Sequence, residues 1–187
     1  MRTFLAIEID DYIKNKINET QQIIQDDESA SIKYVETENI HLTLKFFGEI
    51  NEDQLDKIVE ITGETIEKYE KYPLKIVNIG SFPNIYRPRV IWTGIKDKNV
   101  TAGLIEELDE KFNEIGFEKE RNYVPHITIG RVKHIDNKEN LANTLKKLKK
   151  RYHGKMEVKS VCIKSSKLTP NGPIYKNIRE FKLGDKK

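Results

Sequence analysis

One four-residue pattern occurs twice in this chain, and it constrains the fold more than any other feature. His41-Leu42-Thr43-Leu44 and His126-Ile127-Thr128-Ile129 both read His, apolar, Thr, apolar. Alternation with a period of two is typical of a half-buried β-strand, whose apolar residues enter the core while His and Thr share the opposite face. The two strands lie in different halves of the chain. If their polar faces meet, two imidazoles and two hydroxyls come together in one groove.

The rest of the chain mixes strands with amphipathic helices in both halves. Apolar spacing predicts two helices per half, and alternation predicts further strands, including a long strand over 156–168 that forms a hairpin with 175–183. The expected fold class is α+β: a bilobal, pseudo-symmetric molecule with two antiparallel sheets backed by helices and a central groove. Because there is no long linker, we expect one domain over residues 1–187, with one His-x-Thr-x motif in each lobe.

Composition narrows the class of protein only a little. The net charge of +3 permits an anionic ligand but is far from the strongly basic signature of a nucleic-acid coat. The apolar run at the N-terminus breaks at Glu8, too early for a signal peptide, and no window is long enough to cross a membrane. The single cysteine, Cys162, excludes an intrachain disulfide and fits a reducing compartment. We expect a cytoplasmic monomer that does not associate with membranes.

The paired histidines have several possible uses. The chain has four histidines, and two of them occupy the same position in the same pattern. A zinc site usually recruits a third ligand, and neither motif brings a carboxylate or a cysteine onto its histidine face, so we expect no metal and no other cofactor. A nucleophilic triad is also disfavoured, because His and Thr two residues apart on one strand lie parallel. A single His-x-Thr is more often an ordinary half-buried polar pair.

Two imidazoles that face each other suit the cleavage of a phosphodiester. One can take a proton from a nucleophile while the other gives a proton to a leaving group. The hydroxyls of Thr43 and Thr128 can hold the non-bridging phosphate oxygens as charge builds on them. These arguments provide a pair of roles, but they do not say whether His41 or His126 is the acid.

Candidate cations and aromatic rings follow each motif. Alternation places Lys45 on the face of the first histidine. Arg131 has the wrong parity to face the groove unless Gly130 permits a bulge. Phe46 or Phe47 could stack on a terminal base, since RNA ends are often read by stacking on aromatic rings. Alternation favours Phe47 in the groove; the alternative is that either ring belongs to the core.

Longer strings around these residues resemble the two-histidine (2H) phosphoesterase superfamily, and in particular its RNA 2′,3′-cyclic phosphodiesterase branch, also called 2′-5′ RNA ligase-like proteins. The strings run nearly end to end and are, in order, Arg2-Thr-Phe-Leu-Ala-Ile, His41-Leu-Thr-Leu-Lys-Phe-Phe-Gly-Glu, Arg87-Pro-Arg-Val-Ile-Trp, Pro125-His-Ile-Thr-Ile-Gly-Arg, and Ser166-Lys-Leu through Gly172-Pro-Ile-Tyr175. The resemblance implies a bilobal fold with both motifs in a central groove. It also implies metal-independent hydrolysis of a terminal RNA 2′,3′-cyclic phosphate to a 2′-phosphate.

The resemblance further implies a role for each site residue. His41 corresponds to the proton donor to the departing 3′ oxygen, and His126 to the proton acceptor that activates water. Thr43 and Thr128 correspond to the phosphate-holding hydroxyls, and Arg131 corresponds to the substrate-binding arginine that follows the second motif. The family position favours Phe46 over Phe47 for the terminal base. A weak reverse reaction, joining RNA ends through a 2′-5′ bond, also follows from the family name.

Two other functions stay open at the level of sequence. The same motifs would serve a cyclic nucleotide or 2′-5′ oligonucleotide phosphodiesterase, because they describe the phosphate and not the rest of the ligand. A non-catalytic RNA-binding module is the second alternative. Such modules need aromatic rings exposed on the sheet, whereas the site faces here carry His and Thr. The leading expectation is an enzyme whose partner is RNA with a 2′,3′-cyclic phosphate end.

Overall fold

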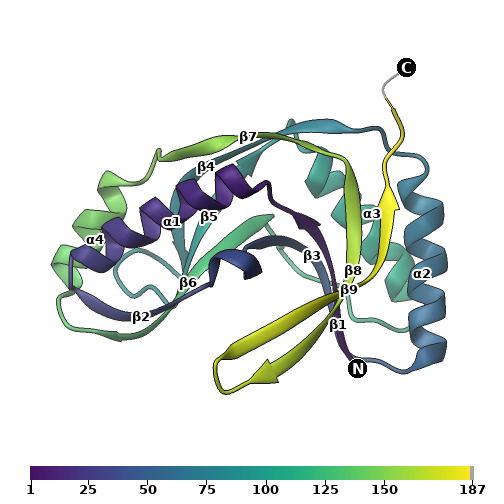
Figure 1. Cartoon of the computed structure of the whole chain (residues 1–187), viewed down its shortest axis with the longest axis horizontal. Coiled ribbons are helices and arrows are strands. Elements are labelled where there is room, and N and C mark those ends of the chain that lie inside the picture. Colours follow the sequence, from purple (N-terminus) through teal and green to yellow (C-terminus); the bar gives the residue numbers. More distant parts are fainter. Residues whose placement is uncertain (186–187) are drawn as a thin grey trace.

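The computed structural model describes residues 1–185; residues 186 and 187 of the expected domain lie outside the described part. Its elements (Figure 1) are, in order, β1 Arg2–Glu8, α1 Asp11–Asp26, β2 Ala30–Tyr34, the 3-10 helix η1 Thr37–Asn39, β3 His41–Glu49, α2 Glu52–Ile66, β4 Tyr72–Phe82, β5 Val90–Lys96, α3 Val100–Glu114, β6 His126–Ile135, α4 Lys138–Lys147, β7 Tyr152–Val158, β8 Ser160–Thr169 and β9 Gly172–Lys182.

The strands form two antiparallel sheets, which confirms the predicted α+β class. One sheet has the order β3-β1-β8-β9 and the other the order β2-β6-β5-β4-β7. Helices α2 and α3 cover the outer side of the four-stranded sheet, and α1 and α4 cover the five-stranded one (Figure 1). The first motif strand, β3, is an edge strand, whereas the second, β6, is paired on both sides. Each sheet therefore contributes one motif strand.

The chain passes repeatedly from one sheet to the other. Strands β1 and β3 lie in the four-stranded sheet, while β2, between them in sequence, lies in the five-stranded sheet. The strand predicted over 156–168 is in fact two: β7 pairs with β4, and β8 pairs with β1. The chain leaves one sheet and joins the other at Lys159. Apolar residues on both sides of this crossing are buried, so the alternation alone did not reveal it.

Buried apolar side chains from both sheets and all four helices form one core among the described residues. Local signals set the helix ends. The Asn51 side chain accepts from the backbone N–H of Gln54, whose own side chain accepts from the Asn51 N–H, and this capping box starts α2. Gly116, with φ of +101°, follows the end of α3 as predicted. Within residues 1–185 no helix is long and apolar enough to cross a membrane.

Candidate active site

Both motifs line a single cavity of about 460 Å³. Of the seven predicted site residues, six line it: His41, Thr43 and Phe46 from β3, and His126, Thr128 and Arg131 from β6. The seventh, Phe47, does not. The other lining residues come from β1, from β2 and the turn after it, from η1, and from the far end of the β8–β9 hairpin (Figure 1). The cavity thus lies where the two sheets meet.

The two motif strands carry the same irregularity at the same position. In the pairing of β1 with β3, Leu5 faces Lys45 and Ala6 faces Thr43, so Leu44 is an extra residue. In the pairing of β5 with β6, Ile129 is extra in the same way. A bulge of this kind reverses which face the following side chains occupy. The side chain five residues after each histidine therefore enters the cavity.

Those two side chains are Phe46 and Arg131. The bulge explains how Arg131 reaches the cavity despite its parity, although the extra residue is Ile129 and not the glycine that follows it. Gly130 itself leaves no room for a side chain, since an added Cβ would lie 2.8 Å from Ile32 Cγ2. Phe46 is 45% exposed, and the guanidinium of Arg2 lies 4.9 Å from its ring centroid. One face of an aromatic ring is thus backed by a cation at the cavity edge.

The expectation that alternation places Phe47 in the groove is corrected by the same bulge. Phe47 is only 8% exposed. Its ring packs edge-on against Phe112 of α3 and against Phe117, at centroid distances of 4.9 and 5.1 Å. This side chain belongs to the core behind β3, where no ligand in the cavity can stack on it.

Lys45 is corrected for the same reason. Alternation predicts it beside the first histidine as a phosphate-binding cation, but the extra residue at Leu44 turns it to the opposite side of the sheet. It is 4% exposed and its ammonium group pairs with Asp109 of α3 at 2.6 Å. Lys45 is absent from the cavity lining; within the described part of the chain, the cations that reach the cavity are Arg2, Lys33 and Arg131.

His41 is fixed by its own strand. Its Nδ1 lies 2.7 Å from the carbonyl oxygen of Asn39, and its Nε2 lies 2.7 Å from the Thr43 hydroxyl. A carbonyl oxygen only accepts, so Nδ1 carries the proton of the neutral ring and Nε2 receives the threonine hydrogen. Nε2 is therefore the nitrogen that can exchange a proton with a bound ligand.

The surroundings of His41 favour its neutral form. Burial lowers the pKa of this imidazole below 6.5; the bond to Asn39 opposes the shift and Lys164 adds to it. The rings of Phe4 and Tyr175 lie 5.0 and 5.4 Å from the imidazole centroid. An anionic ligand would act against this shift by stabilising the charged ring.

His126 is oriented by the same kind of hydrogen bond to a backbone carbonyl. Its Nδ1 lies 2.8 Å from the carbonyl oxygen of Val124, again the residue two positions earlier. The same reasoning assigns the proton to Nδ1 and the lone pair to Nε2. Three rings surround the imidazole: Phe82, Tyr123 and Trp92, with centroid distances of 5.0, 5.7 and 6.3 Å. The two motifs thus present two imidazoles in the same tautomer.

Several lining residues carried no signal in the sequence. Lys33 and Tyr34 enter through β2, which pairs with β6 beside the second motif. Asn39 fixes His41 and also donates from Nδ2 to the carbonyl oxygen of Pro173 at 3.0 Å, so it ties the β8–β9 hairpin to the site. Arg2 and Tyr175 belong to strings noted for the family resemblance, without an assigned role. Sheet pairing brings Lys33, Tyr34, Arg2 and Tyr175 to the motifs, whereas Asn39 lies in η1, directly before the first motif.

Metal-ligating side chains do not gather here. Across residues 1–185, no three His, Cys, Asp or Glu side chains lie close enough together to hold a metal ion. Among the described residues, the charged side chains that line the cavity are those of Arg2, Lys33, Arg131 and Glu36. The arrangement can hold an anion between two imidazoles whose Nε2 atoms can exchange protons with it.

Comparisons with known proteins agree with this geometry. The LigT like Phosphoesterase family model matches residues 7–92 and 96–175. A Methanocaldococcus jannaschii protein named RNA 2′,3′-cyclic phosphodiesterase is 43% identical over 181 residues, covering 97% of this chain and 100% of its own. A Methanothermobacter thermautotrophicus protein of the same name is 38% identical over 183 residues, covering 98% and 99%. The resemblance inferred from the paired motifs is therefore confirmed.

Solved structures agree at the level of fold. A Thermus thermophilus protein superposes with a TM-score of 0.84 at 22% identity, covering 100% of both chains. Escherichia coli LigT complexed with 3′-AMP gives a TM-score of 0.77 at 22% identity, covering 97% of both. The sequence match, the shared fold and the paired motifs lead to one conclusion: this chain belongs to the LigT-like phosphoesterase family.

Proposed function

We propose that this protein hydrolyses the 2′,3′-cyclic phosphate at the end of an RNA to a 2′-phosphate. The observation that carries the proposal is the matched pair of imidazoles, each with Nδ1 bound to a carbonyl and Nε2 left for proton transfer, on one cation-lined cavity. The name shared by the Methanocaldococcus and Methanothermobacter relatives supports this substrate.

In the proposed reaction the two histidines act in opposite directions. His126 Nε2 takes a proton from water as the oxygen attacks phosphorus. The bond from phosphorus to the 3′ oxygen breaks, and His41, protonated at Nε2, gives its proton to that oxygen. The product carries a 2′-phosphate and a 3′-hydroxyl. The assignment of acid and base follows the family resemblance.

Phosphate binding is proposed for three other residues. The Thr43 hydroxyl, 2.7 Å from His41 Nε2, can turn its hydrogen to a phosphate oxygen once the imidazole is charged. Thr128 is its counterpart on β6, and Arg131 lines the same cavity. Arginine can offer two parallel N–H groups to a phosphate as negative charge grows on its oxygens.

Phe46 is the proposed platform for the terminal base. Its ring lines the cavity and is backed on one side by Arg2, which leaves the other side for a base. We propose that the reaction needs no metal or other cofactor, because both proton transfers are assigned to imidazoles. Weak 2′-5′ joining of RNA ends would be the reverse of the same chemistry. We also propose that the protein is a cytoplasmic monomer.

The test uses a short RNA ending in a 2′,3′-cyclic phosphate, incubated with the protein in excess EDTA. The expected product carries a 2′-phosphate, identified by its resistance to enzymes that remove only 3′-phosphates. His41→Ala and His126→Ala should each lower kcat by at least about 100-fold while the circular dichroism spectrum stays native. Substantial turnover in either variant would overturn the two-histidine mechanism.

The product also separates the alternatives. A 3′-phosphate product would mean that the bond from phosphorus to the 2′ oxygen breaks instead, and that the proton is delivered to that oxygen. If the RNA is untouched but cyclic nucleotides or 2′-5′ linked oligonucleotides are cleaved, the scaffold serves a sister substrate. RNA binding without cleavage of any of these substrates would favour the non-catalytic module.

A further inference from the structure

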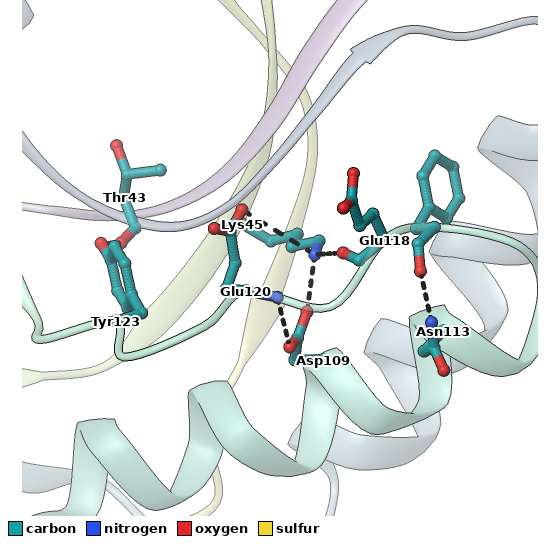
Figure 2. Close-up of polar contacts among 8 residues, drawn as sticks. Thr43, Lys45, Asp109, Asn113, Glu118, Glu120 and Tyr123 are labelled. Atoms are coloured by element: carbon teal, nitrogen blue, oxygen red, sulfur yellow. Dashed lines mark hydrogen bonds and ion pairs between the residues drawn. The ribbon is translucent and has the colours of Figure 1, made fainter.

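A buried lysine on the far side of β3 connects the first motif strand to the segment that leads into the second. Lys45 Nζ donates to Asp109 Oδ1 and to the carbonyl oxygen of Glu118, both at 2.6 Å (Figure 2). Asp109, 7% exposed in α3, accepts from the backbone N–H of Glu120 at 3.0 Å with its second oxygen. Glu118 and Glu120 lie in segment 115–125, which runs from α3 to the second motif. The ion pair therefore holds the backbone of this segment at two points.

The same segment reaches the first motif again before it enters β6. The Tyr123 hydroxyl donates to the carbonyl oxygen of Thr43 at 2.6 Å (Figure 2). Its ring lies 5.7 Å from the His126 ring, and the next residue, Val124, supplies the carbonyl that fixes His126 Nδ1. The orientation of His126 thus depends on where segment 115–125 lies against β3.

A third contact fixes the start of the segment. The carbonyl oxygen of Phe117 accepts from Asn113 Nδ2 at 2.8 Å, and the Phe117 ring packs against Phe47. In Figure 2 these contacts follow one another along the segment, from the end of α3 to Thr43. Segment 115–125 contains no helix or strand, so the contacts to β3 and α3 take the place of regular backbone hydrogen bonds.

The charges of Lys45 and Asp109 are not explained by stability alone. An apolar pair of similar volume is often as stable as a buried ion pair, because it avoids the cost of removing two charges from water. Such a pair could not donate to the Glu118 carbonyl or accept from the Glu120 N–H. The charged groups therefore supply two backbone anchors that an apolar core would lack.

We propose that Lys45 and Asp109 are positioning residues for the second motif, acting through segment 115–125 on His126. The kinetic consequence of this inference rests on the proposed two-histidine reaction, whereas the positioning of His126 does not depend on that reaction. Lys45 does not line the cavity, so its loss should not weaken substrate binding directly. It should instead let Tyr123 and His126 move away from the geometry needed for proton transfer.

The test uses the double variant Lys45→Met/Asp109→Leu, because the single variants would leave one buried charge unpaired and lower Tm by about 10 °C. The matched control is Lys71→Met/Asp185→Leu, which removes a pair of the same length, 2.6 Å, from the surface. We expect kcat on the cyclic-phosphate RNA to fall about 10- to 100-fold in the core variant, with KM within about twofold. The control should keep native kinetics.

A double-mutant cycle that combines Tyr123→Phe with the core double variant tests whether the effect of Lys45 passes through Tyr123. If Lys45 acts through Tyr123, removing the Tyr123 hydroxyl from the core double variant should lower kcat no further than about twofold. Fully additive losses would mean that the two act independently, and native kcat in the core variant would make the pair purely structural. A raised KM with unchanged kcat would return Lys45 to a role in ligand binding. Each of these three results overturns the proposal.

A spectroscopic readout separates this inference from the proposed reaction. In protein with ¹³C-labelled histidine rings, the His126 signal should shift or broaden in the core double variant, whereas the buried His153 signal should not. This result is expected even if the RNA proves not to be a substrate. An unchanged His126 signal in the core variant would overturn the positioning role whatever the activity.

Discussion

His41 shows how burial of one side chain shapes the proposed reaction. Burial lowers the pKa of His41, Lys164 adds to the effect and Glu8 opposes it. A proton donor must carry its proton, so kcat/KM should fall as the pH rises through a value below 6.5. A bound phosphate stabilises the imidazolium, and the corresponding limb of kcat should lie at higher pH.

Lys164→Met should move the alkaline limb of the kcat/KM profile to higher pH. The substitution removes a cation that lowers the pKa of His41 and leaves its ion-pair partner, Glu8, to act on the imidazole. The measurement is the pH dependence of kcat/KM, with Lys182→Met on the exposed part of β9 as control. A limb that stays in place or moves to lower pH would contradict this electrostatic account.

Phe46 and Phe47 are neighbours in sequence with opposite environments, and alanine substitution should separate them. Phe46→Ala should raise KM roughly tenfold, because base stacking is worth about 1–3 kcal/mol, and leave Tm nearly unchanged. Phe47→Ala should lower the free energy of unfolding by about 3–5 kcal/mol through the cavity it leaves in the core. Thermal denaturation and steady-state kinetics of both variants check this; equal losses of stability would contradict it.

At the scale of elements, the facing of side chains along the motif strands was predictable only as far as the fourth residue of each motif, the buried Leu44 or Ile129. The alternation of His, apolar and Thr located both strands and the shared face of the histidine and threonine. The extra residue at Leu44 follows from the register between β1 and β3, which the apolar pattern does not encode. The sequence therefore misplaced Lys45 and Phe47. Gly130 gave a local hint for Arg131, and no such hint precedes Phe46.

The site residues outside the motifs depend on strand order, which local patterns do not specify. Lys33 and Tyr34 line the cavity because β2 pairs with β6, although β3 is the next strand in sequence. The crossing at Lys159 was hidden because both β7 and β8 bury apolar residues next to it. Tertiary pairing, rather than propensity, decided these features.

Gly130→Ala tests how tightly the second bulge is packed. The added Cβ would lie 2.8 Å from Ile32 Cγ2 and 3.4 Å from Tyr34 Cδ1. Overpacking of this kind should cost about 1–3 kcal/mol of unfolding free energy. Gly103→Ala is the matched control, because its Cβ meets nothing within 4 Å and alanine favours helix α3 by about 1 kcal/mol. In urea denaturation, the free energy of unfolding should decrease for Gly130→Ala and increase for Gly103→Ala. A stabilised Gly130→Ala would contradict the packing argument.

At the scale of the whole molecule, one buried histidine links a helix to the sheet it covers. His153 of β7 is 2% exposed and lies 2.8 Å from the Thr20 hydroxyl of α1 and 3.1 Å from the Thr93 hydroxyl of β5. Burial lowers the pKa of His153 to about 4, and Arg151 adds to the shift. The folded protein therefore keeps this ring neutral at a pH where the unfolded chain binds a proton.

Stability should accordingly fall as the pH drops from 6.5 to 4, with no further loss from this group below that range. The expected loss is on the order of 2 kcal/mol, after allowance for solvent screening. In His153→Gln, which can still hydrogen-bond to both threonines, Tm should depend less on pH in this window. Thermal melts of both proteins at pH 7 and pH 4 give the comparison, and parallel losses would contradict the assignment to His153.

The alternation of the chain between the sheets has a consequence for its two halves. Although each half carries a complete motif, neither contains a complete sheet: β1, which carries β3 on its other side, pairs with β8, and β2 pairs with β6. A protease cut in the exposed loop between β4 and β5 would leave two fragments joined by β-ladders in both sheets. The two fragments would stay associated, with both histidines in place. Either fragment alone would expose unpaired strand edges and would lack the strands needed to complete either sheet.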